Sequence, residues 1–175
     1  MKKLLLLLIT TFTLSCCNKD DDTPIAEIEK LPPATQTGAN TFGCLLDEKA
    51  FLPGNFPNAT NCFYQFVNGE YYFVVSAAID TNDNLKVIRL RTEKKQIYEG
   101  ETYDLFEWID GNAIGNFTNN NIELFTSHTQ TGKLTITKLD EINYIVSGTF
   151  WFDVIDNNGV VHQIREGRFD FEYTN

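Results

Sequence analysis

Residue types that carry catalysis or bind metals are sparse in this sequence. The chain has two histidines, His128 and His162, far apart in sequence, so a metal site would need carboxylate ligands as well. It has no Gly-x-Ser-x-Gly nucleophile motif, no His-Glu-x-x-His zinc motif and no phosphate-binding loop. The sequence therefore predicts no catalytic residue, no metal site and no cofactor.

The acidic residues form no motif either. Asp80, Asn82 and Asn84 resemble the start of a calcium-binding loop, but Leu85 stands where that loop needs glycine and Arg91 where it needs glutamate. A polar turn explains these residues better. The 24 acidic residues offer many carboxylate pairs, so a pair by itself does not indicate glycoside hydrolysis.

Trp151 is the strongest candidate for a ligand contact. If Asn158-Gly159 is a hairpin turn, Trp151 lies on the polar face of the sheet, beside Glu166 and near Arg168. An indole flanked by charges there can stack on a sugar or on a protein partner. A nearby loop offers amides for hydrogen bonds, at Asn112, Asn116 and Asn119 to Asn121. The alternative is that Trp151 packs beneath a neighbouring loop.

Two alternating segments, residues 144–155 and 160–173, position these candidates and flank the Asn158-Gly159 turn. The predicted core face pairs Tyr144 with Tyr173, Val146 with Phe171, Gly148 with Phe169 and Phe150 with Gly167, so that a phenylalanine covers each glycine. The predicted solvent face pairs Ser147 with Asp170, Thr149 with Arg168 and Trp151 with Glu166. One pair does not fit, because Phe152 faces Arg165 on the core side.

A second hairpin is predicted from residues 62–67 and 70–79, which flank Asn68-Gly69. Its register pairs Phe66 with Tyr71, Tyr64 with Phe73 and Cys62 with Val75 on one face. The opposite face is also largely apolar, which places this hairpin near the middle of the sheet.

Further strands are expected at residues 85–92, 100–105, 122–126 and 133–139, and residues 110–121 are expected to form a loop rich in glycine and asparagine. About nine strands with no long amphipathic helix predict an all-β fold. The architecture is either an antiparallel β-sandwich or a flattened up-and-down, calycin-like barrel.

The first residues have the pattern of an exported lipoprotein. A two-lysine start precedes the apolar run at residues 4–14, which is too short to span a bilayer and is typical of a secretory signal. Cys17 follows Leu14 and two small residues, as a lipobox requires, whereas Cys16 has threonine at the leucine position. We therefore expect residues 1–16 to be removed and Cys17 to carry the palmitate-type anchor. The alternative is a plain secretory signal.

The residues after the lipidated position are Lys19, Asp20, Asp21 and Asp22. A lysine followed by acidic residues at this place resembles the export signal of surface lipoproteins in Bacteroidota; a solvated acidic linker is the plainer interpretation. The resemblance implies a protein anchored in the outer membrane and exposed at the cell surface. Residues 17–40 are expected to form a tether, stopped from forming more than one helical turn by Pro32 and Pro33, and residues 41–175 the domain.

Two cysteines lie within the domain, Cys44 and Cys62. An even pair in an exported protein predicts a disulfide, which would close a loop of about 19 residues and add about 3 kcal/mol of stability. The alternative is a pair of buried free thiols, which pack as small apolar side chains.

Four short runs resemble a known group of proteins. They are Leu31-Pro-Pro-Ala-Thr-Gln-Thr-Gly-Ala-Asn-Thr-Phe-Gly-Cys44, Phe51-Leu-Pro-Gly54, Ser147-Gly-Thr-Phe150 and Glu166-Gly-Arg-Phe-Asp170. They look like the opening and closing segments of an uncharacterised family of small Bacteroidota surface lipoproteins. The resemblance implies an all-β surface lipoprotein and brings no known catalytic residues with it.

The charge of the chain limits its partners. The net charge is −10, and removal of residues 1–16, which contain two lysines, would make it −12, so we expect no binding to nucleic acid. We predict a membrane-anchored, non-enzymatic binding module for a glycan, a protein partner or a small apolar molecule. The alternatives are an accessory subunit of an outer-membrane assembly, and an enzyme or inhibitor of unrecognised type.

Overall fold

The computed structural model describes residues 24–81 and 84–175, so residues 1–16, Cys17 and the predicted export signal at residues 19–22 lie outside the described part. Its elements are η1 (Glu27–Lys30), β1 (Thr41–Leu46), β2 (Lys49–Phe51), β3 (Thr60–Val67), β4 (Glu70–Asp80), β5 (Leu85–Thr92), β6 (Thr102–Leu105), β7 (Ala113–Asn119), β8 (Ile122–Phe125), β9 (Gly132–Asp140), β10 (Ile145–Ile155) and β11 (Val161–Glu172). Within the described ranges no helix is long and apolar enough to cross a membrane.

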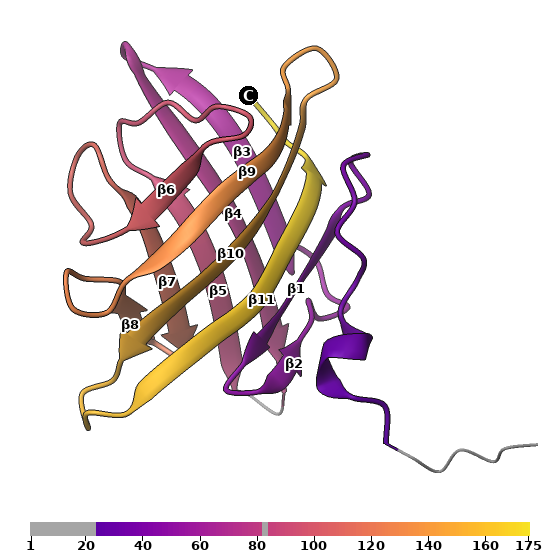
Figure 1. The fold of residues 1–175 in the computed structure, drawn as a ribbon, viewed down its shortest axis with the longest axis vertical. Helices are drawn as coiled ribbons and strands as arrows, with labels where there is room; N and C mark the ends of the chain where they lie inside the picture. The colour runs from indigo at the N-terminus through magenta and orange to yellow at the C-terminus, as the bar shows by residue number, and fades with distance from the viewer. Residues whose placement is uncertain (1–23, 82–83) are drawn as a thin grey trace, which may run out of the picture.

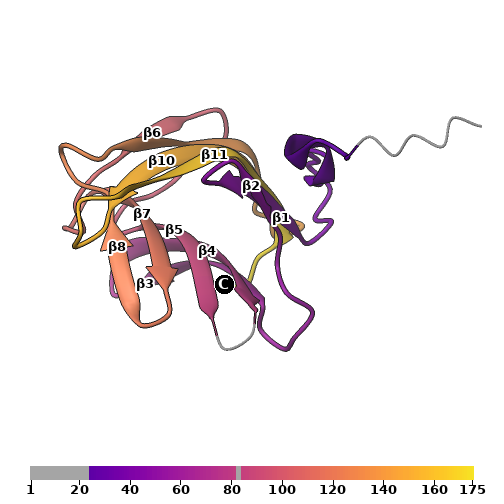
Figure 2. The ribbon, with the colours of Figure 1, turned by 90° about the horizontal axis from the view of Figure 1, so that it is seen from below.

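The predicted all-β class is confirmed, with eleven strands in the described residues rather than about nine. They form one sheet in the order β2-β1-β11-β10-β9-β6-β7-β5-β4-β3, with β8 paired to β7. The sheet is mixed because β6 and β7 run parallel. It bends over on itself into two layers, with β10 and β11 in one and β4 and β5 in the other (Figures 1 and 2). A bridge joins Phe63 on β3, the last strand, to Thr174 just after β11, and the sheet is not closed into a barrel.

Apolar side chains fill the space between the two layers. Phe42, Phe73, Phe117 and Phe152 are among the largest fully buried residues of this core. Burying a side chain of this size contributes about 1.5–3 kcal/mol, so the interior holds the layers together. The surfaces that remain for ligands are the outer faces and the ends of the sheet.

Both predicted hairpins are present. β3 and β4 pair in the predicted register around Asn68-Gly69, where positive φ angles of 52° and 87° give the turn that suits twisted strands. β10 and β11 pair Gly148 with Phe169 and Phe150 with Gly167, as predicted. A Cβ atom added to either glycine would lie 2.6 or 2.5 Å from the facing ring, so these glycines let the rings lie on bare backbone.

Two kinds of difference remain. The strands β1, β2 and β7 were not predicted, and β3 has a different place in the sheet from the one predicted. β7 lies within the predicted loop at residues 110–121. Its glycine and asparagine contribute to packing and do not form a turn. A Cβ on Gly115 would lie 2.8 Å from the Phe152 ring, and buried Asn116 donates to the Leu124 carbonyl at 3.1 Å. The β3–β4 hairpin does not lie mid-sheet, since β3 is the last strand.

Much of the predicted tether is docked on the domain. The single helical turn expected there is η1, and Leu31 after it is buried. Pro32 lies against Gly43, where an added Cβ would lie 2.6 Å from the proline ring. Residues 31–40, the strap, therefore belong to the fold and not to a free spacer.

The strap is held by one carboxylate, that of Asp170 on β11. The Thr35 hydroxyl donates to it at 2.7 Å, and the amides of Thr37, Gly38 and Ala39 donate at 2.9, 2.9 and 3.1 Å. The Ser147 hydroxyl adds a bond of 2.7 Å from β10. Ser147 and Asp170, predicted to face solvent, are buried because the strap covers them.

The predicted Cys44–Cys62 disulfide is absent. Both residues are free and buried, Cys44 on β1 and Cys62 on β3, and burial raises the pKa of each thiol. An even number of cysteines says nothing about where the fold places them. Here both thiols pack in the core as small apolar groups, the alternative that the sequence leaves open.

Candidate functional site

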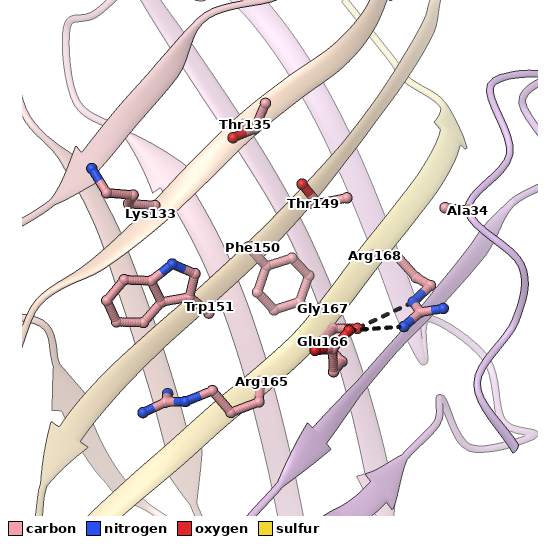
Figure 3. A pocket seen from close by; sticks show the side chains of 10 residues that line it. All are labelled: Ala34, Lys133, Thr135, Thr149, Phe150, Trp151, Arg165, Glu166, Gly167 and Arg168. Atoms are coloured by element: carbon pink, nitrogen blue, oxygen red, sulfur yellow. Dashed lines mark hydrogen bonds and ion pairs between the residues drawn. The ribbon is translucent and has the colours of Figure 1, made fainter. Parts of the chain in front are cut away.

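A depression on the outer face of β9, β10 and β11 contains all three predicted contact residues, Trp151, Glu166 and Arg168 (Figure 3). Its volume is about 350 Å³. The other lining residues are Ala34, Lys133, Thr135, Thr149, Phe150, Arg165 and Gly167. The Trp151 side chain lies between those of Lys133 and Arg165 and is 37% exposed. We call this site the Trp151 depression.

A β-bulge in β11 builds this site. Phe150 pairs with Gly167, but Phe152 pairs with Ile164, so Arg165 and Glu166 together face Trp151. The extra residue lets buried Ile164 meet Phe152 in the core and turns Arg165 outward, which resolves the misfit in the predicted register. At the bulge Glu166 adopts a left-handed backbone, with φ 54°.

Arg165 is fixed beside the indole by several contacts. Its guanidinium carbon lies 5.3 Å from the centre of the Trp151 ring, within the range of a cation–π interaction. One terminal nitrogen donates to the Phe152 and Ile164 carbonyls at 3.1 and 2.9 Å, and the other lies 2.7 Å from the Asp153 carboxylate. Arg165 and Trp151 therefore form a preorganised surface rather than two mobile side chains.

Two further basic side chains border the depression. The Arg168 Nε donates to the Glu166 carbonyl at 3.1 Å, and its Nη2 lies 3.6 Å from the Glu166 carboxylate. Lys133 lies 2.8 Å from Asp104 and is half-exposed. The lining thus holds three basic residues and one carboxylate on a chain with net charge −10. Such a surface suits an anionic ligand with an apolar face for the indole.

The strap forms one wall of the depression, through Ala34. Its position depends on Asp170. Burial by itself raises the pKa of the Asp170 carboxyl, but the converging hydrogen bonds, first that of the Thr37 amide, outweigh it and hold the pKa well below its usual range. Asp170 is therefore ionised wherever the protein is folded near neutral pH, and the wall stays in place.

The structure brings the predicted trio together and adds Lys133 and Arg165. Lys133 lies directly opposite Trp151 on β9, a pairing that the register of β9 and β10 would reveal. Arg165 could be found only from its misfit with Phe152. The predicted asparagines do not line the depression, and Asn112 and Asn116 instead bond the Glu107 and Leu124 carbonyls.

The histidines lie apart from each other and from the Trp151 depression. His128 Nδ1 is 2.7 Å from Glu107, and His162 Nδ1 is 2.7 Å from Asp47. Among residues 24–81 and 84–175, no three His, Cys, Asp or Glu side chains gather into a group that could hold a metal ion. Each histidine thus has one carboxylate partner and no further ligand set.

Comparisons of this chain with known protein families, with curated proteins and with solved structures gave no match. Function must therefore be argued from the site itself.

Proposed function

We propose that this protein is a lipid-anchored surface lipoprotein whose β domain binds an acidic carbohydrate in the Trp151 depression without transforming it. The observation that carries the proposal is the indole of Trp151 set among three basic side chains on an acidic chain. The apolar face of a sugar ring packs on indole, and uronate or sulfate groups pair with arginine and lysine. A volume of about 350 Å³ falls within the range of small-ligand sites.

The lining favours binding over catalysis. Glycoside hydrolysis uses two carboxyl groups on either side of the scissile bond, and Glu166 is the only acidic residue among the described residues that line this depression. Its carboxylate lies 3.6 Å from the Arg168 Nη2 and has no second carboxyl group facing it in the lining. A bound sugar would meet cations and an aromatic ring, groups that hold a ligand in place.

The filled interior supports a site on the outside of the sheet. Large side chains such as Phe42 and Phe73 occupy the space in which a hollow barrel would hold a small apolar ligand. We infer that the two layers work as a sandwich-like support and that recognition takes place on their outer surfaces. Membership of the Bacteroidota family that the sequence resembles stays a prediction.

Tryptophan fluorescence tests the carbohydrate site directly, because the chain has only two tryptophans. In a Trp108→Phe variant Trp151 is the sole reporter, and oligogalacturonate or sulfated oligosaccharides should change its emission saturably. Trp151→Ala should lower the affinity about tenfold, whereas Trp108→Ala, which removes an indole 47% exposed elsewhere, should not. Equal binding of neutral oligosaccharides, or equal binding by Trp151→Ala, would refute the proposal.

The anchor is tested separately. Cys17→Ala should release the protein from membranes, and continued sedimentation with them would refute lipidation. Replacing Asp20, Asp21 and Asp22 by alanine should protect the protein from protease added outside the cell. Unchanged digestion would remove the surface-export assignment while leaving the carbohydrate site untouched.

A further inference from the structure

A second depression lies at one end of the curled sheet, away from the Trp151 depression. It is lined by Tyr64, Phe66, Tyr71, Glu141, Tyr144, Tyr173 and Asn175 and has a volume of about 550 Å³. The β3–β4 hairpin, the β9–β10 turn and the end of β11 supply these residues, and Figure 1 places the β9–β10 turn beside the C-terminus. We call it the tyrosine basin.

Five aromatic rings form a continuous arc around this basin. The ring centres of Phe66 and Tyr71 are 4.6 Å apart, and those of Tyr71 and Tyr64 are 5.4 Å apart. The arc continues from Tyr64 to Tyr173 at 5.9 Å and from Tyr173 to Tyr144 at 5.7 Å. Each ring is held by the next, so the basin presents preformed aromatic surfaces at several orientations.

The two ends of the arc are open and its middle is fixed. Phe66 and Tyr144 are 62% and 44% exposed, whereas Tyr64 and Tyr173 are buried apart from the surface they show to the basin. The hydroxyl of Tyr64 accepts a hydrogen bond from the Ile97 amide at 3.3 Å, which anchors the central ring. Exposed rings at the ends of a fixed arc can enclose a small ligand without rearrangement of the core.

The charge at the basin is negative. Glu141 is the one charged side chain of its lining, and no lysine or arginine lies among the described residues that form it. Burial, together with the negative charge of Glu141, raises the pKa of Tyr173 to about 12. The basin therefore combines ring faces, which carry partial negative charge, with a carboxylate that nothing in the lining neutralises.

Tyr144 is held in a strained conformation. Its φ is 57°, a left-handed backbone that suits glycine or asparagine and is uncommon for a tyrosine. Its carbonyl accepts a hydrogen bond from the Tyr173 amide at 2.7 Å, and its ring packs on Tyr173. Strain of this kind collects at ligand sites, and here it accompanies an aromatic side chain that lines the basin.

We propose that the tyrosine basin binds an organic cation, specifically a quaternary ammonium group of the choline type. Such a group is compact and apolar on its surface yet charged, so it is stabilised by several ring faces at once and cannot donate hydrogen bonds. Glu141 supplies the opposite charge at the rim. The ammonium group belongs either to a free small molecule or to the headgroup of a phosphocholine lipid.

The test compares choline chloride with 3,3-dimethyl-1-butanol, which has nearly the same shape and no charge. On the full mature domain, proton NMR should show saturable upfield shifts and saturation transfer for the choline methyl groups, and neither for the neutral alcohol. Sedimentation with phosphatidylcholine vesicles, with phosphatidylglycerol vesicles as control, distinguishes the lipid source from the free molecule. Failure of both choline and the phosphatidylcholine vesicles, or equal binding of the alcohol, would overturn the proposal.

Variants at the open ends of the arc keep the test independent of folding. Phe66→Leu and Tyr144→Asn should each lower choline affinity roughly three- to fivefold, and Glu141→Gln by a smaller factor. Tyr144→Asn also suits the left-handed backbone, so a loss of binding with retained stability isolates the ring. Tyr98→Leu, which removes an exposed tyrosine outside the basin, is the matched control. Unchanged binding in all three basin variants would contradict the assignment.

Discussion

The Trp151 depression and the tyrosine basin lie on the same sheet, but their linings differ in charge and in aromatic content. The first lies on an outer face, where alternating side chains normally meet only water, and it joins three basic residues to a single indole. The second lies at an end of the sheet, where the aromatic core continues into solvent, and its one charged residue is acidic. We therefore propose that the same chain presents an anion site and a cation site at different places.

The difference lies in how each site is built. The basin results from regular strand pairing, since Tyr64, Phe66 and Tyr71 are brought together by an unbroken β3–β4 register. The Trp151 depression depends on an irregularity, the bulge at Glu166, and on a strap from a distant part of the chain. Changes to the strap or to the bulge should therefore affect one site and leave the other intact.

The largest expected effect comes from Asp170→Asn. The carboxylate accepts bonds from three strap amides and three hydroxyls, and an asparagine side chain would turn an amide donor toward several of these donors. We expect a loss of about 3 kcal/mol or more in the free energy of unfolding, measured by urea titration. Binding at the Trp151 depression should weaken as its Ala34 wall loosens, whereas choline binding at the basin should persist.

Asp110→Asn is the matched control for this change, because Asp110 is an exposed aspartate paired only with Lys94 at the surface. It should leave the urea midpoint nearly unchanged. If Asp170→Asn were no more destabilising than Asp110→Asn, the strap would not be held in the way described.

The next largest effect should be on the pH dependence of stability, which should differ between the two regions. The lowered pKa of Asp170 means that its contribution is complete above about pH 4, the unfolded value, and is lost as the pH falls below it. The raised pKa of Tyr173 favours the neutral form in the folded state, so its contribution is complete below about pH 10 and is lost as the pH rises toward 12.

Urea midpoints measured from pH 2 to 12 check both limbs. Asp170→Asn should make the acid limb less steep and leave the alkaline limb unchanged. Tyr173→Phe, which keeps the ring, should make the alkaline limb less steep and leave the acid limb unchanged, while the buried thiols of Cys44 and Cys62 still contribute to the alkaline limb. A variant that altered both limbs equally would show that the two regions do not titrate independently.

Glu166→Gly should have a smaller effect, in the stabilising direction. A non-glycine residue in a left-handed backbone costs about 1–2 kcal/mol, which glycine avoids although it adds freedom to the unfolded chain. We expect a net gain of about 0.5–1 kcal/mol, with the bulge and Arg165 kept in place. Glu166→Val should destabilise the protein instead. A gain from valine as large as that from glycine would mean that the bulge is not strained.

Features that arise from local pattern could be predicted from the sequence. Asn68-Gly69 fixes the register that forms the basin, and the alternation of Val146, Gly148 and Phe150 identifies the core face of β10. The same alternation identifies Trp151 as an outward-facing residue. These parts are predictable because pairing across a short turn involves residues close in the chain.

The parts that were not predicted depend on contacts between distant segments. Asp170 looks exposed until residues 35–39, some 130 positions earlier, are known to cover it. Gly115 and Asn116 look like loop residues until the Phe152 ring and the Leu124 carbonyl are placed beside them. The bulge was visible only as a misfit between Phe152 and Arg165. That misfit was thus the best local sign of the Trp151 depression.

The smallest expected effect concerns Lys133, at the exposed border of the Trp151 depression. Because its side chain is half-exposed and already paired with Asp104, Lys133→Gln should leave the urea midpoint unchanged and lower acidic-oligosaccharide affinity only about two- to threefold. The difference from the unmodified protein should vanish as added salt screens the charge. Lys94→Gln, which removes an exposed lysine elsewhere, should have no effect on the same titration. An equal loss of choline binding in Lys133→Gln would show that the anion site and the cation site are coupled, against the independence of the two regions.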